Sequence, residues 1–295
     1  MHSSSNVAEK LGIIVLNYNN YKLTREMVNE ILKNEFFQSV KIVIVDNASP
    51  NESYAVLSKE FENRVPVIKT EKNGGYSYGN NVGIKYLRDN YPDVRYCAIC
   101  NPDVILNDVS VKKMLKFMQE HSDIKLLGCV ATDIDNNIQK YCWKQPGVMH
   151  EIFSSEIICN RFIRKSTEYT NEELSKEFLY VDVALGAFFI AEMDALFEVD
   201  LLSEDTFLYC EEQILTHRLK QKGYQIGVLN TCSYIHNHIE PTSMKKKTLN
   251  YMNHQKSKLI YLKTCCHINY ATELLFKFIS GIGIIERKVL SLFIK

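Results

Sequence analysis

The chain has 295 residues, of which 46% are hydrophobic and 24% charged, and its formal net charge is zero. This composition is typical of a globular protein with a large core, and the balanced charge argues against nucleic acid as a partner. No apolar run approaches the roughly 18 residues that span a bilayer, and residues 1–10 lack the apolar core of a signal peptide. We therefore expect a cytoplasmic protein.

The nine cysteines are scattered, and an odd number cannot all pair within one chain. Cys97 and Cys100 form a C-x-x-C, but they lie in an apolar run and no second pair completes a zinc site. Buried, reduced thiols are the expected state, which agrees with a reducing cytoplasm.

Apolar runs alternate with helical patterns through the first half of the chain. The runs that indicate buried strands lie at residues 11–16, 40–45, 65–69, 96–100 and 126–131. Helical spacing occurs at residues 23–32, in a segment that ends at Leu87, and at residues 109–119. Either Ser49 or Asn51 is expected to cap the helix after the second strand. Alternating strands and helices predict an α/β fold with a mostly parallel, doubly wound sheet.

Polar residues cluster where these strands end, at residues 17–20, 46–49, 73–81 and 101–103. Turn chemistry alone explains any single cluster. Because all of these clusters would lie on the carboxyl edge of one sheet, together they indicate a binding crevice. The carboxylate of Asp103 is suited to binding a divalent cation, which would in turn bind a diphosphate. The chain has neither a G-x-G-x-x-G nor a phosphate-loop motif, so a bound nucleotide would be held by Asp and Asn side chains and a metal.

The second half is less regular. Residues 132–177, which include the single tryptophan Trp143, are interpreted as an insertion over the crevice. Earlier in the chain, residues 71–83 form a connector rich in glycine and asparagine. A helix is predicted to follow residue 210 and to stop at Gly223. It is flanked by strand-like segments at 178–190, which Gly186 and Ala187 interrupt, and at 225–229.

Two pairs of residues in this half could carry chemistry. Glu211 and Glu212 begin the predicted helix, where they either interact with its dipole or supply one general base, because adjacent helical side chains point about 100° apart. His236 and His238 are two positions apart and would share one side of a strand. They are either ordinary structural histidines or metal ligands.

The order and spacing of these motifs resemble family 2 glycosyltransferases, and more narrowly the rhamnosyltransferase-like branch that builds bacterial surface polysaccharides. The resemblance covers residues 11–243 and rests on the segments 17–19, 45–49, 73–76, 79–83, 101–103, 186–187, 207–212, Arg218, Gly223 and His236. Asn101 stands at the first position of the family's D-x-D motif, and Glu212 stands where the family usually has Asp.

The resemblance implies a GT-A fold and inverting transfer of a sugar from a UDP- or dTDP-sugar to a glycan or lipid-linked acceptor, with Mn²⁺ or Mg²⁺. By family role, Asp103 and His236 would bind the metal, and Glu212 would be the base, with Glu211 as the other candidate. The nucleotide pocket would contain Asn17, Tyr18, Asn19, Asp46, Asn47, Ser49, Asn73, Gly74, Gly75, Asn80 and Asn101. Gly186, Ala187 and Trp143 would lie near the acceptor.

Residues 244–295 follow the predicted catalytic domain (1–243, with halves at about 11–131 and 132–243) as a basic amphipathic tail. The tail is expected either to pack on the domain, to form a homodimer contact or to lie on an anionic membrane.

Two rival functions are open as well: a nucleotidyltransferase that makes nucleotide-sugars, and a non-catalytic nucleotide- or sugar-binding module.

Overall fold

The computed structural model describes residues 8–238 and 244–293. The predicted domain boundary at residue 243 and the end of the tail at residues 294–295 lie outside the described residues, as do residues 1–7 of the N-terminal segment.

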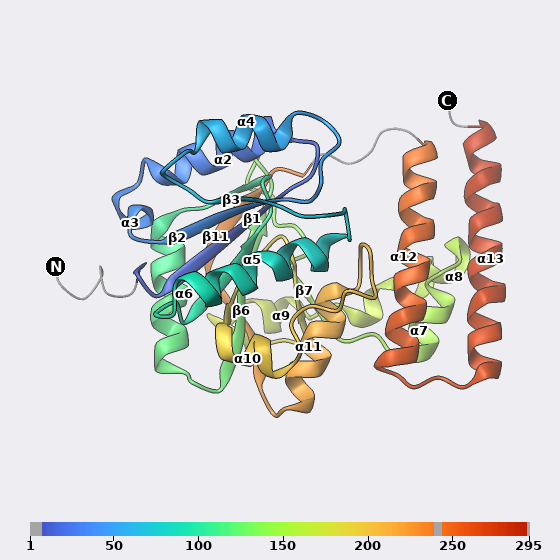
Figure 1. The fold of residues 1–295 in the computed structure, drawn as a ribbon. Coiled ribbons are helices and arrows are strands. Elements are labelled where there is room, and N and C mark those ends of the chain that lie inside the picture. The colour runs from blue at the N-terminus through green and yellow to red at the C-terminus, as the bar shows by residue number, and fades with distance from the viewer. Residues whose placement is uncertain (1–7, 239–243, 294–295) are drawn as a thin grey trace.

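A sheet of nine strands forms the centre of the fold (Figure 1). Its strands are β1 (Leu11–Asn17), β2 (Lys41–Asp46), β3 (Val67–Lys69), β4 (Tyr96–Cys100), β5 (Val104–Ile105), β6 (Ile124–Thr132), β8 (Phe178–Tyr180), β10 (Phe188–Glu192) and β11 (Gln225–His236). Their order is β3-β2-β1-β4-β10-β6-β11-β5, with β8 beside β11, and β7 (Cys142–Trp143) pairs with β9 (Val183–Ala184) in a small second sheet.

The predicted doubly wound, mostly parallel sheet is confirmed, with one antiparallel strand at its centre. Strands β3, β2, β1 and β4 are parallel, as are β6 and β11, whereas β10 runs antiparallel to both of its neighbours, β4 and β6. The strand-like segment 178–190 therefore divides into β8, β9 and β10, and only its last part enters the middle of the sheet.

Helices cover both faces of the sheet, as a doubly wound order requires. The helices are α2 (Tyr21–Leu32), α3 (Glu35–Gln38), α4 (Ser53–Glu60), α5 (Tyr76–Asn90), α6 (Asp108–Glu120), α7 (Val148–Phe153), α8 (Ile157–Ile163), the 3₁₀ helix η1 (Arg164–Thr167), α9 (Asn171–Leu174), α10 (Met193–Glu198), α11 (Glu211–Gln221), α12 (Met244–Thr264) and α13 (Tyr270–Phe293). Figure 1 shows α2 and α4 on one face and α5 on the other.

Two local predictions are wrong at helix starts. The N-cap of α4 is Glu52, while Asn51 accepts a hydrogen bond from the amide of Ser53, and Ser49 instead accepts one from the amide of Asn19. The connector predicted to reach residue 83 ends at Gly75, whose φ of +93° stops the extended chain so that α5 begins at Tyr76.

The register of the sheet brings the predicted polar clusters to one edge. Asn17 pairs with Asp46 at the ends of β1 and β2, and Val15 pairs with Cys100 at the end of β4. Because parallel strands share their carboxyl edge, the segments after these strands are neighbours in space.

The region 132–177 is not simply an irregular cover over the crevice. Its beginning lies beside β11, where the side-chain amide of Gln139 donates to the carbonyl of His236 (3.0 Å). Its later part folds into α7, α8, η1 and α9, and α7 contacts the C-terminal helices α12 and α13.

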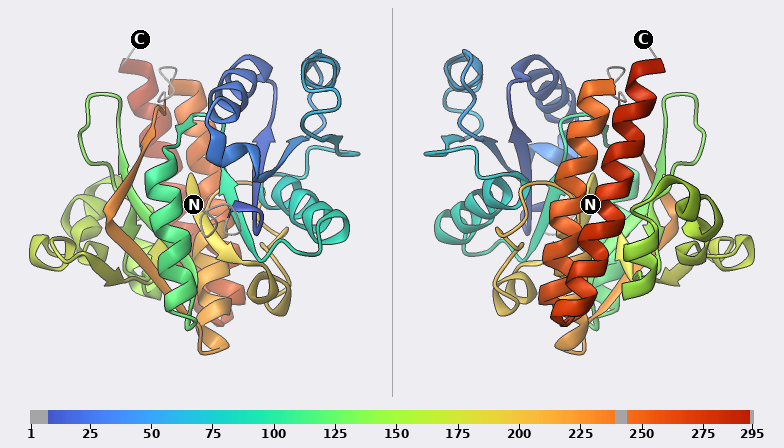
Figure 2. Two further views of the ribbon diagram at one scale, coloured as in Figure 1. Left: turned by 90° about the vertical axis from the view of Figure 1, so that its left-hand side faces the viewer. Right: turned by 90° about the vertical axis from the view of Figure 1, so that its right-hand side faces the viewer.

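The C-terminal helices form an antiparallel pair that packs on the domain beside α7 and α8 (Figures 1 and 2). Side chains from α12 and α13 share a buried cluster with α7 and α11, made of Ile152, Cys210, Ile214, Tyr261, Leu262, Cys265 and Phe276. Of the three alternatives for the tail, packing on the domain is thus present in the structure. Within residues 8–238 and 244–293, no helix has the length and apolar character to cross a bilayer.

All nine cysteines are free, and seven of them are buried. This agrees with the prediction of reduced, structural thiols.

The packing of the tail is tested by two phenylalanines that lie two positions apart on α13. Phe276 is 2% exposed and Phe278 67% exposed. We expect Phe276→Ala to lower the free energy of unfolding by about 3–5 kcal/mol through lost burial and a cavity, and Phe278→Ala to change it by less than about 0.5 kcal/mol. Urea denaturation of both variants measures the difference. Equal losses would contradict this packing.

Candidate active site

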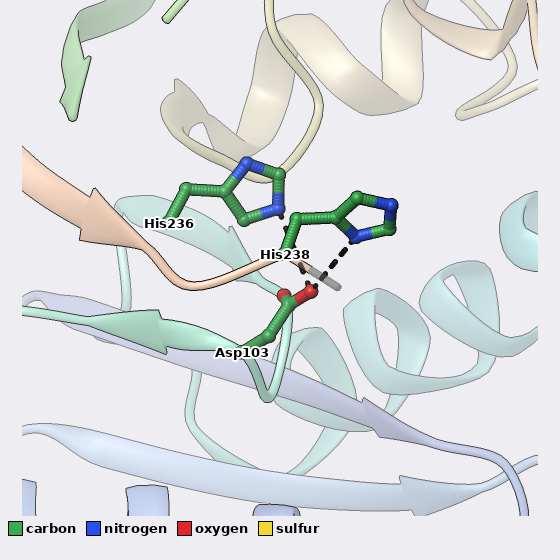
Figure 3. A group of neighbouring side chains, drawn as sticks. All are labelled: Asp103, His236 and His238. Carbon is green, nitrogen blue, oxygen red and sulfur yellow. Dashed lines mark hydrogen bonds and ion pairs between the residues drawn. The ribbon is translucent and has the colours of Figure 1, made fainter. Parts of the chain in front are cut away.

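Three metal-ligating side chains meet at the carboxyl edge of the sheet (Figure 3). Asp103 lies between β4 and β5, His236 ends β11, and His238 follows two residues later. The pairing of β5 with β11 brings them together, because Val104 is the register partner of His236 and the amide of Asn237 donates to the carbonyl of Asp103 (2.9 Å).

Both imidazoles point at the same carboxylate oxygen. Oδ2 of Asp103 lies 3.5 Å from Nε2 of His236 and 3.3 Å from Nδ1 of His238. Burial by itself would raise the pKa of Asp103, but the hydrogen bonds and charges of the two histidines outweigh burial, and the net effect is a lowered pKa. Asp103 is therefore ionised at neutral pH.

The arrangement fits a divalent cation. Oδ1 of Asp103 is buried and has no hydrogen-bond partner among the described residues, which is a costly state that a cation would relieve. Because the amide of Gln139 donates to the His236 carbonyl, its Oε1 is the atom that accepts from Nδ1 of His236 (3.2 Å). This contact orients the ring so that Nε2 is directed at the carboxylate of Asp103, where it would be a ligand of a bound cation.

A second group of acidic residues begins α11. Tyr209 and Cys210, which precede the helix, both have left-handed backbone conformations, with φ of 77° and 65°. Glu211 is 3% exposed, and its Oε1 has no hydrogen-bond partner in the described parts of the chain. Glu212 is partly exposed, and its Oε1 accepts a hydrogen bond from the amide of Gly186 (3.1 Å).

Burial raises the pKa of both carboxyl groups. The pKa of Glu211 is raised to about 8, first by burial and second by the charge of Glu212, and burial also raises the pKa of Glu212. Of the two, Glu212 is the less buried residue and contacts Gly186, whereas Glu211 is 3% exposed and has no such contact among the described residues.

Gly186 and Ala187 connect the two groups. The carbonyl of Ala187 accepts from the amide of Asn101 (2.9 Å), while Gly186 binds Glu212 through its amide and accepts from the hydroxyl of Tyr76 (2.5 Å) through its carbonyl. A Cβ at position 186 would lie 2.4 Å from Oε1 of Glu212, so only glycine leaves room for this carboxylate.

Several predicted nucleotide-pocket residues form a buried network behind the crevice. The amide of Asn17 donates to Oδ2 of Asp46 (2.7 Å), and Oδ1 of Asp46 accepts from the amide of Ser49 (2.9 Å). These side chains fix the strand ends and the turns that follow them. In contrast, Tyr18 and Asn19 are exposed.

The remaining predicted pocket residues belong to the connector before α5. The side-chain amide of Asn47 donates to Oδ1 of Asn73 (3.0 Å) and to the carbonyl of Gly75 (2.9 Å). A Cβ at Gly74 would meet Tyr78, and one at Gly75 would meet the backbone of Phe207 at 2.2 Å. The connector is thus packed tightly against the loop that precedes α11.

Asn80 and Trp143 lie further from these groups. Asn80 is buried within α5, where its side chain donates to the carbonyl of Tyr76 (3.0 Å). Trp143 is half-buried in β7 and pairs with Val183, three residues before Gly186, with the ammonium of Lys140 5.4 Å from its ring centre.

Of the two alternatives for His238, the structure places it beside Asp103 as a candidate ligand, and it adds Gln139 and Tyr76, to which the sequence assigned no role. The two-residue spacing of His236 and His238 was a usable signal for the first. Gln139 and Tyr76 reach the site through long-range contacts that no local motif marks.

The raised pKa of Glu211 gives a test by pH. Because the folded state binds this proton more tightly than the unfolded chain does, the contribution of Glu211 to stability falls as pH rises from about 4.5 to about 8. We expect Glu211→Gln to match the wild type at pH 5 and to be more stable by at least about 1 kcal/mol at pH 8. Denaturation at both pH values, with the exposed Glu62→Gln as control, measures this. A variant that loses stability at pH 8 relative to the wild type would contradict the assignment.

Comparison with known proteins identifies the family. The family model described as Glycosyl transferase family 2 matches residues 12–181. GlyG, a glycosyltransferase of Streptococcus pneumoniae, is 26% identical over 52% of this chain and 50% of its own length. The rhamnosyltransferase WbbL of Escherichia coli is 21% identical over 85% of this chain and 91% of its own. The chain thus spans only half the length of GlyG.

Solved structures agree on the fold. TarS 1-349 of S. aureus in complex with UDP-GlcNAc has a TM-score of 0.58 at 17% identity, over 94% of this chain and 72% of that one. The mannosyltransferase PcManGT of Pyrobaculum calidifontis, in complex with GDP-Man and Mn²⁺, has a TM-score of 0.56 at 10% identity, over 96% and 87%. These likenesses establish the GT-A fold that the sequence motifs imply. With more than half of its residues inside the matched region, the chain belongs to glycosyl transferase family 2.

Proposed function

We propose that this protein is an inverting, metal-assisted glycosyltransferase that moves a sugar from a UDP- or dTDP-sugar to a glycan or lipid-linked acceptor in polysaccharide biosynthesis. One observation carries the proposal. The amide of Gly186 binds Glu212, and the next residue, Ala187, accepts from the amide of Asn101, two residues before Asp103 of the Asp103–His236–His238 group. Membership of family 2 and the names of its relatives support the same class of reaction.

Asp103, His236 and His238 would hold Mn²⁺ or Mg²⁺. A divalent cation bound there would neutralise the charge that develops on the departing nucleoside diphosphate. The ionised Asp103 and the orientation of His236 by Gln139 suit these residues to that task. The complex of PcManGT with GDP-Man and Mn²⁺ supports a cation in a protein of this fold. With two imidazole nitrogens, the set favours Mn²⁺ over Mg²⁺.

Glu212 would act as the general base. It takes the proton of the acceptor hydroxyl while that oxygen bonds to the anomeric carbon and the carbon–oxygen bond to the diphosphate breaks, so that the configuration inverts. Its raised pKa makes it a stronger proton acceptor than an exposed carboxylate. Its bond to the Gly186 amide directs Oε1, and Gly186, Ala187 and Trp143 would border the acceptor.

The buried network of Asn17, Asp46 and Ser49 would shape the nucleoside pocket, with Tyr18 and Asn19 on its rim. Whether the protein binds UDP-sugars or dTDP-sugars would depend on this pocket. The UDP-GlcNAc complex of TarS makes UDP-sugars the first donors to test.

The two rival functions fit less well. A nucleotidyltransferase needs a Gly- and Arg-rich phosphate loop after the first strand, where this chain has residues 17–20 (NYNN). A non-catalytic binding module does not require a carboxyl group with a raised pKa such as that of Glu212.

The function is tested with two matched variants and two measurements. Asp103→Asn is expected to remove the Mn²⁺-dependent rise in melting temperature that UDP produces, because the anionic ligand is lost. Glu212→Gln is expected to keep that rise but to lower sugar transfer by about 10²-fold or more, as loss of a general base does. A panel of labelled UDP- and dTDP-sugars provides the assay. Wild-type transfer by Glu212→Gln would contradict the base assignment, and absence of transfer or hydrolysis by the wild type with every donor would favour the binding module.

An exposed apolar face of the tail supports attachment to the inner surface of the cell membrane. On α13 this face contains Leu274, Phe278, Ile285 and Val289, which recur at helical spacing, and α8 adds Ile158 and Phe162. Lys277 and Lys288 of α13 and Arg161 of α8 are exposed cations on the same helices, and Lys277 pairs with Glu273 (2.7 Å). Apolar side chains flanked by cations are the pattern of a helix lying on anionic lipid, where a lipid-linked acceptor would be found.

Membrane attachment is tested by flotation with liposomes of phosphatidylcholine, with and without phosphatidylglycerol. We expect the wild type to float with the anionic liposomes and Phe278→Glu/Ile285→Glu to stay behind, because two buried charges oppose insertion. The control Val109→Glu/Ile134→Glu changes two exposed apolar residues elsewhere. Unchanged flotation of the α13 variant would contradict the proposal. If light scattering shows that the wild type is a dimer and the α13 variant a monomer, the face is instead a contact with a second copy of the chain. Deletion of the tail is unsuitable, since it would uncover the cluster around Phe276.

A further inference from the structure

The C-terminal helix α12 contacts the loop that leads into α11, the helix that carries the candidate base. We infer that Ser257 and Lys258 of α12 are positioning residues that set the orientation of Glu212. The inference rests on the proposed function, in which Glu212 is the base. It assigns a part in the reaction to residues 244–293, which lie outside the region matched by the family model.

The turn before α11 needs support from outside. Tyr209 and Cys210 are consecutive non-glycine residues in the left-handed region, with φ of 77° and 65°. Such conformations persist only where surrounding structure holds them. Because Glu212 lies two residues after this turn, any relaxation of the turn would rotate the first turn of α11 and move the carboxylate away from the Gly186 amide.

Helix α12 provides direct contacts to this turn. The hydroxyl of Ser257, which is 2% exposed, donates to the carbonyl of Leu208 at 2.7 Å. One helical turn earlier, the ring of His254 lies against that of Tyr209, with the ring centres 5.0 Å apart. Cys210 itself is buried in the cluster that includes Tyr261 and Leu262 of α12. The turn is therefore held by hydrogen bonding, ring contact and burial from the same helix.

Lys258 is linked to the first turn of α11 through Glu151. Its ammonium group pairs with Oε2 of Glu151 at 2.8 Å and donates to the hydroxyl of Ser154 at 2.7 Å. Oε1 of Glu151 accepts from the side chain of Gln213, the residue after Glu212, at 3.2 Å. The Lys258 and Glu151 side chains are 7% and 3% exposed.

A buried charge pair of this kind restricts geometry more than it adds stability. Its cost of desolvation is offset only while both partners keep their hydrogen bonds, so departures from the observed arrangement are disfavoured. Gln213 is thereby fixed relative to α7 and α12, and the adjacent Glu212 is fixed with it. The carboxylate thus has a defined direction before any acceptor arrives, which is what a catalytic base requires.

Ser257→Ala tests the inference with little risk to folding, because it removes one hydroxyl. With a UDP-sugar donor and Mn²⁺, we expect kcat to fall about tenfold while KM for the donor and the UDP-dependent rise in melting temperature stay within about twofold of wild type. Thr264→Ala on the same helix is the matched control, since its hydroxyl bonds within the helix to the carbonyl of Ile260. This control is expected to keep wild-type kcat.

A double-mutant cycle separates positioning from general damage. If Ser257 acts through Glu212, Ser257→Ala should reduce kcat by less than about twofold in a Glu212→Gln background. A full tenfold loss in that background would overturn the inference, as would unchanged kcat in Ser257→Ala alone. The paired variant Glu151→Gln/Lys258→Met, which replaces the buried charges with neutral groups, should lower kcat in the same way.

The outcome for the proposed function is read separately. If Glu212→Gln itself retains wild-type kcat, the base assignment is wrong. If Glu212→Gln is impaired but the losses from the two sites multiply, the base assignment stands and only the positioning role of α12 fails.

Discussion

The candidate site depends on two adjacent peptide groups, at Gly186 and Ala187, which connect Glu212 to the end of β4. The amide of Gly186 binds the carboxylate of Glu212, and the carbonyl of Ala187 binds the amide of Asn101 at the end of β4. Because β10 begins at Phe188 and pairs antiparallel with β4, these groups cannot shift without disturbing the centre of the sheet. Residue 186 must also be glycine, since any side chain would occupy the space of Oε1. The rigidity of a buried sheet is thus transmitted to the carboxylate.

The same crevice separates two kinds of carboxylate by their surroundings. Asp103 remains ionised because two imidazoles outweigh the effect of its burial. The pKa values of Glu211 and Glu212 are raised, since burial outweighs the backbone hydrogen bonds that would lower them. Acidic side chains therefore provide both groups: an anionic carboxylate that can bind a cation, and a carboxylate that can accept a proton. The proposed chemistry requires this division of roles.

The C-terminal helices extend this arrangement beyond the part of the chain that the family model covers. Their inner side completes a buried cluster with α7 and α11, and their outer side leaves an apolar face exposed. One pair of helices therefore connects the region around the proposed base with the apolar face that we propose binds a membrane. This link would explain why an insertion and a tail that are far apart in the sequence form one buried ion pair, Glu151–Lys258.

Much of the fold and part of the site can be predicted from local sequence. Buried strands show as uninterrupted apolar runs, and β4 coincides with its predicted range, because burial on both faces leaves a simple pattern. The carboxyl-edge clusters and Asp103 follow from the rule that parallel strands end together. Asp103 and His236 also match the positions at which a resemblance to family 2 would place a metal.

Other features were decided by contacts between distant segments, which no local pattern records. The antiparallel insertion of β10, the approach of His238 to Asp103 and the orientation of His236 by Gln139 depend on how the sheet is assembled. The proposal of Glu212 as the base in place of Glu211 also depends on the fold, because adjacent helical residues differ only in what surrounds them. The sequence determined which residues could carry the chemistry, and tertiary packing decided which of them meet, since burial and charge act through space and not along the chain.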